Sequence, residues 1–177
     1  MTIPLRSCWD IQRLDRSHDR TAFECGKLAL DDWLQRLASQ HERRDLARVY
    51  VAVEGAERRV VGYYALSTHH VACDALPKEQ KKGLPPLDVP VILLGRLAVD
   101  KTVQRRGLGE HLLIDALRRA DHIARHIGVR AVEVHAVDDD ARGFYLKYGF
   151  VGLQDDHNHL YLPMQVVRQL HLPPFGP

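Results

Sequence analysis

The stretch from residue 91 to residue 136 constrains the fold more than any other part of the chain. It begins with a continuous apolar run, Val91–Val99, which is typical of a strand buried on both faces. Leu108–Ile127 follows with its apolar residues on one helical stripe, and Gly128 is expected to close this helix. Arg130–Ala136 then alternates as a second strand. A strand, a helix and a strand in this order predict a parallel, right-handed crossover.

The rest of the chain supplies further helices and strands of a mixed α/β or α+β sheet. Apolar spacing predicts helices over Leu28–Gln40 and Ala141–Lys147, a hairpin of Arg48–Glu54 and Arg59–Ser67, and final strands over Phe150–Leu153 and His159–Val167. The chain has 177 residues, which fits one domain over 1–177, with a Pro-rich tail at 170–177.

Composition excludes several classes of protein. The formal net charge is only +2, so there is no basic coat for DNA, although a local anion site is compatible with it. The apolar runs are far shorter than the roughly 20 residues of a membrane-spanning helix. No secretory signal is recognised at the N-terminus, so we expect a cytoplasmic protein. Three widely separated cysteines (Cys8, Cys25 and Cys73) and 11 histidines show no metal-ligand spacing, so we expect reduced thiols and no metal.

The segment after the apolar strand has the features of an anion site. The strand ends at Leu97-Ala98-Val99, a polar loop follows, and a helix begins at Gly107-Leu108-Gly109. Glycines let a backbone approach a ligand closely, and the first turn of a helix offers free N–H groups and the positive end of its dipole. Arg105 and Arg106 add charge. A phosphate-binding P-loop and a GxGxxG dinucleotide motif are both absent, and two glycines alone also fit a plain turn that starts a helix.

Two motifs together give a specific resemblance. Residues 104–109, Gln-Arg-Arg-Gly-Leu-Gly, match the Q/R-x-x-G-x-G/A signature of the GNAT superfamily of N-acetyltransferases. Residues 141–150 resemble the family's A-x-x-F-Y-x-x-x-G-F, and one helix and one strand lie between the motifs. The resemblance implies a mixed, largely antiparallel sheet with one splayed parallel pair, flanked by helices. It also implies that acetyl-CoA binds with its pyrophosphate on the backbone of the first motif and its pantetheine arm along Leu94–Val99. The implied cofactor-binding residues are Leu97, Ala98, Val99, Gln104, Arg105, Arg106, Gly107, Leu108, Gly109 and Phe144.

The second motif carries the candidate catalytic group. In GNAT enzymes the tyrosine of the F-Y pair protonates the leaving thiolate, and Tyr145 matches it. An ordinary tyrosine, with a pKa near 10, is protonated at neutral pH and can donate to sulfur. Phe144 is expected to be the packing residue of the pair. Glu133 and His135 share a strand face beside the cofactor slot, and each is either a general base or a polar residue of the sheet face.

Further stretches resemble acetyltransferase toxins of bacterial type II toxin–antitoxin pairs. These are Phe-Glu-Cys-Gly at 23–26, Leu-Gly-Arg-Leu-Ala-Val-Asp at 94–100 and Val-His-Ala-Val-Asp at 134–138, and the likeness extends from about Phe23 to Phe150. Those toxins acetylate the α-amino group of aminoacyl-tRNA and so block translation. The resemblance implies tRNA as acceptor, a homodimer and a ribbon–helix–helix antitoxin whose complex binds operator DNA. Basic side chains would contact RNA phosphates. The candidates on the acceptor side are Arg36, Arg43, Arg44, Lys78, Arg96, Glu133 and His135.

Two alternatives stay open at this point. A GNAT enzyme could acetylate a small amine or a protein N-terminus, in which case acidic residues would line the acceptor pocket of a polyamine or aminoglycoside enzyme. A non-catalytic module that binds CoA would show loss of Tyr145 or of the glycines, and both are present. Arg96 is a separate signal, because a charge inside a buried strand needs a partner, either a protein carboxylate or RNA.

Overall fold

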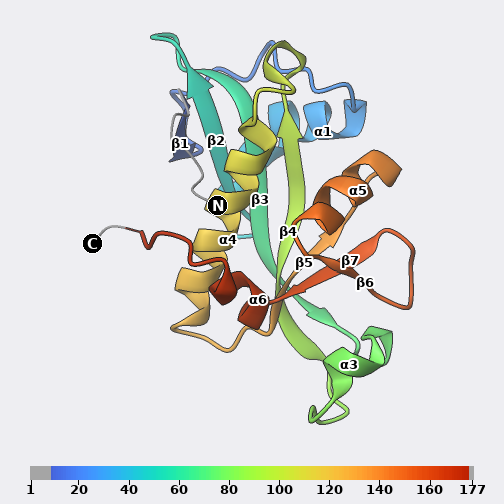
Figure 1. Ribbon diagram of the computed structural model, residues 1–177. Helices are drawn as coiled ribbons and strands as arrows, with labels where there is room; N and C mark the ends of the chain where they lie inside the picture. Colours follow the sequence, from blue (N-terminus) through green and yellow to red (C-terminus); the bar gives the residue numbers. More distant parts are fainter. Residues whose placement is uncertain (1–8, 176–177) are drawn as a thin grey trace. The chain divides into compact units, whose positions relative to one another are not determined.

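The computed structural model describes residues 9–175 (Figure 1). Seven strands form one mixed sheet in the order β1-β2-β3-β4-β5-β7-β6. The strands are β1 (Asp10–Arg13), β2 (Arg48–Glu54), β3 (Arg59–Val71), β4 (Val89–Val99), β5 (Ala131–His135), β6 (Val151–Gly152) and β7 (His159–Pro163). The helical elements are α1 (Leu28–Asp32), η1 (Trp33–Leu37), α2 (Ala38–Arg43), η2 (Cys73–Ala75), α3 (Lys78–Lys81), η3 (Lys101–Val103), α4 (Leu108–Ala124), α5 (Asp139–Lys147) and α6 (Met164–Gln169). The predicted mixed α/β class is confirmed.

The described residues divide into two compact units, each with its own core. The first contains the residues up to Leu66 together with Arg96–Asp115, and the second contains Ser67–Gly95 and the residues from Ala116 onward. The chain elements β3, β4 and α4 each contribute residues to both units. A single domain over 1–177 stays a prediction.

The first unit is built on antiparallel strands. β1 pairs with β2, and β2 pairs with β3 through a register in which Tyr50 faces Tyr64, whose rings stack 5.1 Å apart. This pairing confirms the hairpin expected around Gly55, whose φ of +74° suits glycine in a turn. β1 was not predicted, because four residues with two polar ends give no periodic signal.

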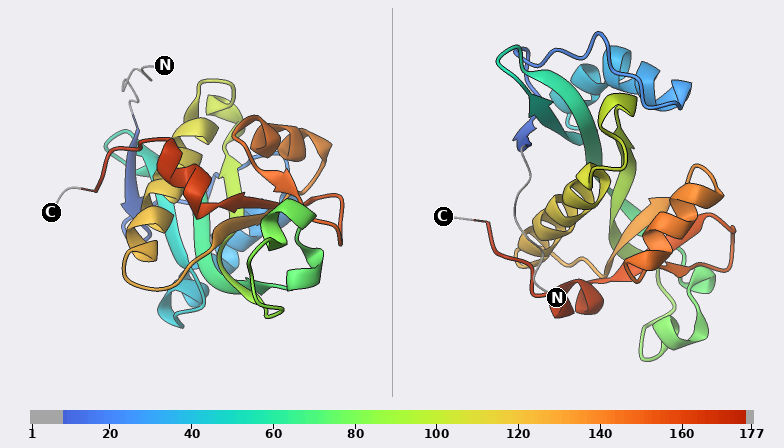
Figure 2. Two further views of the ribbon diagram at one scale, coloured as in Figure 1. Left: turned by 60° about the horizontal axis from the view of Figure 1, so that its bottom comes forward. Right: turned by 45° about the horizontal axis from the view of Figure 1, so that its top comes forward.

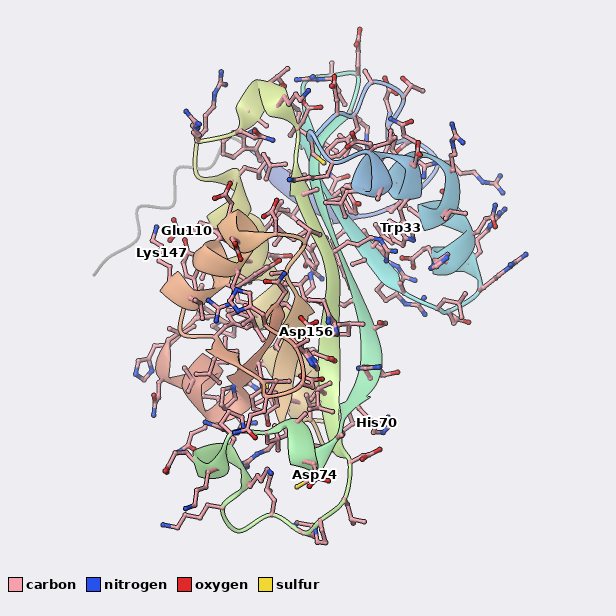
Figure 3. All side chains as sticks on the ribbon, turned by 90° about the vertical axis from the view of Figure 1, so that its right-hand side faces the viewer. Trp33, His70, Asp74, Glu110, Lys147 and Asp156 are labelled. Carbon is pink, nitrogen blue, oxygen red and sulfur yellow. The ribbon has the colours of Figure 1, made fainter. Side chains whose placement is uncertain are left out.

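A helical segment covers the core of this unit. The segment consists of α1, the π-helical η1 and α2 without interruption, so the helix predicted over Leu28–Gln40 is confirmed and extends to Arg43. Trp33, labelled in Figure 3, is 3% exposed and stacks on Tyr63 with ring centroids 5.9 Å apart. Five residues of π-helix at this point rotate the segment relative to a regular α-helix.

The second unit holds the parallel strand pair. The first residues of β4 pair with β5 in parallel, from Val91 opposite Ala131 to Leu93 opposite Glu133. β5 also pairs with β7 in antiparallel fashion along its whole length, and β7 pairs with β6. Residues such as Val71, Leu76 and Tyr161 form its core. Figure 2 shows the short α3 on the excursion between β3 and β4, and α6 on the chain after β7.

The structure corrects two predicted ends. α4 ends at Ala124, where tight turn bonds such as His126 N–H to the Ile123 carbonyl take over, so Gly128 does not cap it and Ile127 is 54% exposed. The last strand stops at Pro163 instead of Val167, because the chain then enters α6 and buries Met164 and Val167 on one helical face.

Candidate active site

Side chains of the first unit build the loop that was predicted to bind an anion. Asp100, 3% exposed, accepts hydrogen bonds from the Thr102 N–H and hydroxyl and from the Glu24 N–H. Burial raises the pKa of Asp100, but these hydrogen bonds outweigh it and leave the pKa below its ordinary value. The Gln104 amide donates to the carbonyls of Cys25 and Val99, both at 2.9 Å. The Gln104 side chain therefore fixes the loop instead of reaching outward.

The backbone after Gln104 has the form that an anion cradle requires. Gly107 has φ +87° and a Cβ there would meet nothing within 4 Å, so glycine is needed for its conformation. Arg105 also has a positive φ of 64°. Both arginines and Gly107 are exposed, and α4 begins directly at Leu108 with Gly109 in its first turn. The positive end of a 17-residue helix thus follows an exposed, basic, glycine-containing turn.

The last residues of β4 lead into this loop. Ala98 is 5% exposed and lies in the core of the first unit, whereas Leu97 and Val99 are half-buried. The alternation follows from the period of two along a strand. Leu97 and Val99 therefore lie on the opposite face from Ala98.

The helix α5 of the second unit holds Tyr145. The Asp138 carboxylate caps this helix by accepting from the Ala141 N–H at 2.9 Å, and Gly149, with φ +93°, closes the turn after it. Tyr145 is 6% exposed, and its ring makes an edge contact with Phe150 at 5.3 Å. Burial raises the pKa of Tyr145, so the phenol keeps its proton at all physiological pH values. The ring expected to pack, Phe144, is only half-buried, so Tyr145 is the better buried member of the pair.

Three histidines surround a buried glutamate in the second unit. Glu133 on β5 has no exposed surface. Its Oε1 is 2.6 Å from His159 Nε2 and 3.2 Å from His135 Nε2, and its Oε2 is 2.7 Å from His69 Nδ1. The rings of His135 and His159 stack with centroids 4.2 Å apart. Sequence reasoning identified Glu133 and His135 but missed His159, since nothing in the spacing links β5 to β7.

Asp155 completes the surroundings of His159. The carboxylate of Asp155 lies 2.8 Å from His159 Nδ1. Burial raises the pKa of Asp155, and hydrogen bonds, first of all that from His159, bring it below its ordinary value. Glu133, His135 and His159 also place potential metal-ligand atoms within 4.8 Å of one another. Sequence spacing alone did not reveal this grouping.

The basic residues proposed for RNA occupy different surroundings. Arg36, Arg43 and Arg44 are exposed on or just after the helical segment of the first unit, and Arg36 lies 3.8 Å from Asp32. Lys78 is exposed on α3 of the second unit.

Arg96 has an aromatic partner within the described residues, and the expected choice between a carboxylate and RNA stays open. Its guanidinium carbon lies 4.2 Å from the centroid of the Trp33 ring, and burial lowers its pKa. Within residues 9–175 no ion pair is found for Arg96.

Two further predictions concern the cysteines and membrane-spanning helices. Cys25 and Cys73 are free thiols, as expected, and Cys8 lies outside the described residues. Across residues 9–175, no helix has the length and apolar character to cross a membrane.

Comparisons with known proteins bear on the site as a whole. The chain is 42% identical over 159 residues to a curated "tRNA-acetylating toxin" of Mycobacterium tuberculosis (strain ATCC 25618 / H37Rv), covering 90% of this chain and 94% of that protein. A crystal structure of a tyrosine-to-phenylalanine variant of KacT matches with a TM-score of 0.88 and 34% identity, over 92% of this chain and 98% of that one. AtaT in complex with acetyl-methionyl-tRNAfMet matches with a TM-score of 0.86 and 30% identity, over 92% and 99%.

Other solved complexes contain further ligands. They include an AtaT variant bound to acetyl-CoA and the C-terminus of its antitoxin AtaR, and the KacTA–DNA complex, with TM-scores of 0.80 and 0.74 and identities of 25% and 32%. The model of the acetyltransferase (GNAT) domain family matches residues 45–152, which include both the glycine loop and Tyr145. The chain belongs to the GNAT acetyltransferase family.

Proposed function

We propose that this protein transfers the acetyl group of acetyl-CoA to the α-amino group of aminoacyl-tRNA and so blocks translation. The observation that carries the proposal is the 42% identity, over 90% of this chain, to a relative named as a tRNA-acetylating toxin. The complex of AtaT with acetyl-methionyl-tRNAfMet supports the same acceptor. The acetylated amine can no longer act as a nucleophile, which removes the reactivity that peptide-bond formation needs.

The cofactor half of the site fits acetyl-CoA. The exposed turn of Arg105, Arg106 and Gly107 at the start of α4 offers N–H groups and positive charge to a pyrophosphate. Leu97 and Val99 would line the pantetheine arm, with Phe144 as a further contact. Gln104 contributes by holding the loop through the carbonyls of Cys25 and Val99. When bound, acetyl-CoA supplies the thioester that is attacked.

Tyr145 is assigned as the proton donor to the leaving sulfur. Its burial keeps the phenol protonated, so it enters each turnover as an acid. A phenylalanine at this position retains the ring packing against Phe150 and removes only the hydroxyl. Tyr145→Phe is therefore a matched variant for testing chemistry apart from folding.

The acceptor half needs cations for RNA phosphates. Arg36, Arg43 and Arg44 are exposed, and Arg96 has no acidic partner within the described residues, so all four are assigned to tRNA together with Lys78. The α-amino group itself has a pKa near 7.7–8.0, which is expected to fall further on esterification, so much of it is already neutral.

The partners follow from the same family likeness. We assign a homodimer and a ribbon–helix–helix antitoxin, with the toxin–antitoxin complex binding operator DNA in the cytoplasm. The complex of AtaT with the C-terminus of its antitoxin and the KacTA–DNA complex support an antitoxin and DNA as partners. Co-expression with the product of the neighbouring gene, followed by size-exclusion chromatography, tests the stoichiometry.

Paired expression in a bacterium tests the proposed function. The wild type and Tyr145→Phe are induced in parallel, and charged tRNA from the same cells is analysed by mass spectrometry. Growth arrest with acetylated aminoacyl-tRNA in the wild type alone is the expected result, and the mass identifies the amino acid. Unmodified tRNA in wild-type cells would refute the proposal and leave a small amine or a protein N-terminus as acceptor.

A further inference from the structure

The charges around Glu133 determine which ring nitrogens carry protons. An ionised carboxylate only accepts hydrogen bonds, so a ring nitrogen facing it must donate. His159 faces Glu133 through Nε2 at 2.6 Å and Asp155 through Nδ1 at 2.8 Å. His159 thus lies between two carboxyl groups, with one at each ring nitrogen. It gives the fully buried glutamate a hydrogen-bond partner, which a buried carboxyl group requires.

The same contacts favour a hydrogen-bonded cluster over a metal site. Zinc ligands stand at about 2.0–2.2 Å from the metal in a tetrahedron, which separates two ligand atoms by roughly 3.3 Å. The 2.6 Å between His159 Nε2 and Glu133 Oε1 is shorter than that and fits a hydrogen bond.

His135 is left with one nitrogen available for chemistry. Its Nε2 faces Glu133 and its ring stacks on His159, so its orientation is fixed from two sides. With Nε2–H donating to Glu133, Nδ1 carries the lone pair. The side chain of His135 is 54% exposed, in contrast to 7% for His159. Because Nε2 is engaged by Glu133, Nδ1 is the nitrogen of His135 that can accept a proton. A carboxylate that fixes the tautomer of a histidine is the arrangement used for general bases.

The position in the sheet connects this histidine with the proposed reaction. The parallel pairing of β4 and β5 ends at Leu93 opposite Glu133. If the pyrophosphate binds at residues 104–109 and the pantetheine arm runs back along β4 from Val99, the thioester end is reached near Leu94, the residue after that pair. We infer that His135, oriented by Glu133, accepts the proton of the attacking α-amino group. This inference rests on the proposed function and adds the general base that it lacked.

The proton balance of the step is complete. The amine nitrogen forms a bond to the acetyl carbon, the C–S bond breaks, and its electron pair leaves with sulfur. Sulfur takes the phenolic proton of Tyr145, and the amine nitrogen gives its proton to Nδ1 of His135. Water then carries one proton from His135 back to Tyr145, so the products are an amide and the CoA thiol.

His69 is the alternative candidate for the general base. It also contacts Glu133 and its side chain is 51% exposed, but it lacks the stacking that orients His135. The charged and titratable groups around His135 are Glu133 on β5, His69 on β3, His159 on β7 and Asp155 before β7. His70, which follows His69 in the sequence and is labelled in Figure 3, is exposed and serves as a matched control.

The test is the pH dependence of kcat/KM with purified full-length protein, labelled acetyl-CoA and bulk charged tRNA. His135→Gln should lower kcat/KM about 100-fold or more and alter the acid limb of the profile, leaving only the ionisation of the amine itself. His69→Gln and His70→Gln should retain that limb. His135→Ala should regain rate in proportion to added imidazole, which a merely structural defect would not do. Thermal melts show whether each variant is folded.

The outcomes distinguish a failure of the proposed function from a failure of the role assigned to His135. A wild type that acetylates no aminoacyl-tRNA overturns the proposed function, and the inference falls with it. An active wild type whose His135 variants keep the full rate and the acid limb overturns only the inference, as would loss of the limb in His69→Gln instead. Wild-type activity that is lost in EDTA and restored by Zn²⁺ would mean that the cluster holds a metal, which also overturns it.

Discussion

Gly62 is the position where one added methyl group should test the packing under the cofactor loop. A Cβ built on Gly62 of β3 would lie 2.9 Å from Leu112 Cδ1 and 3.0 Å from Leu108 Cδ2. Both leucines are at most 1% exposed, so their methyl groups have little space to move into. Gly62→Ala should therefore push α4 away from β3 at its first residue, Leu108.

The magnitude follows from two opposing effects. Overpacking a core costs about 1–3 kcal/mol, and replacing a strand glycine by alanine returns about 0.5–1 kcal/mol. The midpoints of these two ranges leave a net destabilisation of about 1 kcal/mol, which for a chain of this length lowers the melting temperature by roughly 2–4 °C. Gly62→Val, with a larger side chain, should exceed this.

Thermal unfolding and titration with acetyl-CoA measure the two consequences. Gly62→Ala should melt lower and bind acetyl-CoA more weakly, because displacement of Leu108 moves the neighbouring Gly107. Gly128→Ala is the matched control, since a Cβ there meets nothing within 4 Å and its φ is not positive. A Gly62→Ala protein that melts with the wild type and binds acetyl-CoA equally well would refute the packing argument.

Three further predictions concern a helix cap, a buried acid and a thiol. Asp138→Ala removes the cap that accepts from the Ala141 N–H and should cost about 0.5–2 kcal/mol in urea unfolding. Asp100 has a pKa below its ordinary 3.8, so its contribution to stability is complete above pH 3.8 and is lost as the pH falls further; Asp100→Asn should flatten that part of the stability curve. Burial and the hydrogen bond with Asp31 raise the pKa of Cys25 to about 11, so iodoacetamide should modify it slowly at pH 8 and faster near pH 11. Rapid alkylation at pH 8 would contradict that assignment.

The cofactor half of the site was readable from sequence, because its signals are local. An apolar strand, a polar loop and a glycine at the start of an amphipathic helix follow one another directly in the sequence. The positive φ of Gly107 is a finding of the structure. The resemblance placed Gln104 among the cofactor-binding residues. In the fold its amide donates to the Cys25 carbonyl, a contact that no local sequence pattern predicts.

The cluster around Glu133 was only partly predictable. Glu133 and His135 share a strand face by the period of two, which the sequence shows. His69 and His159 come from other strands, and no local spacing connects them with Glu133. The error at α6 has a different cause, because Met164 and Val167 had helical spacing that was read as the continuation of a strand.

The π-helical turn from Trp33 to Leu37 has a consequence for insertions and deletions. A π-helical turn accommodates one more residue than the α-helical turn it replaces. Each residue of an α-helix turns the chain by about 100°, so deleting one residue there would restore a regular helix and swing Leu28 and Leu30 to another side relative to Ala38. A one-residue deletion within these five positions should therefore reorient the start of the segment without breaking its helical hydrogen bonding.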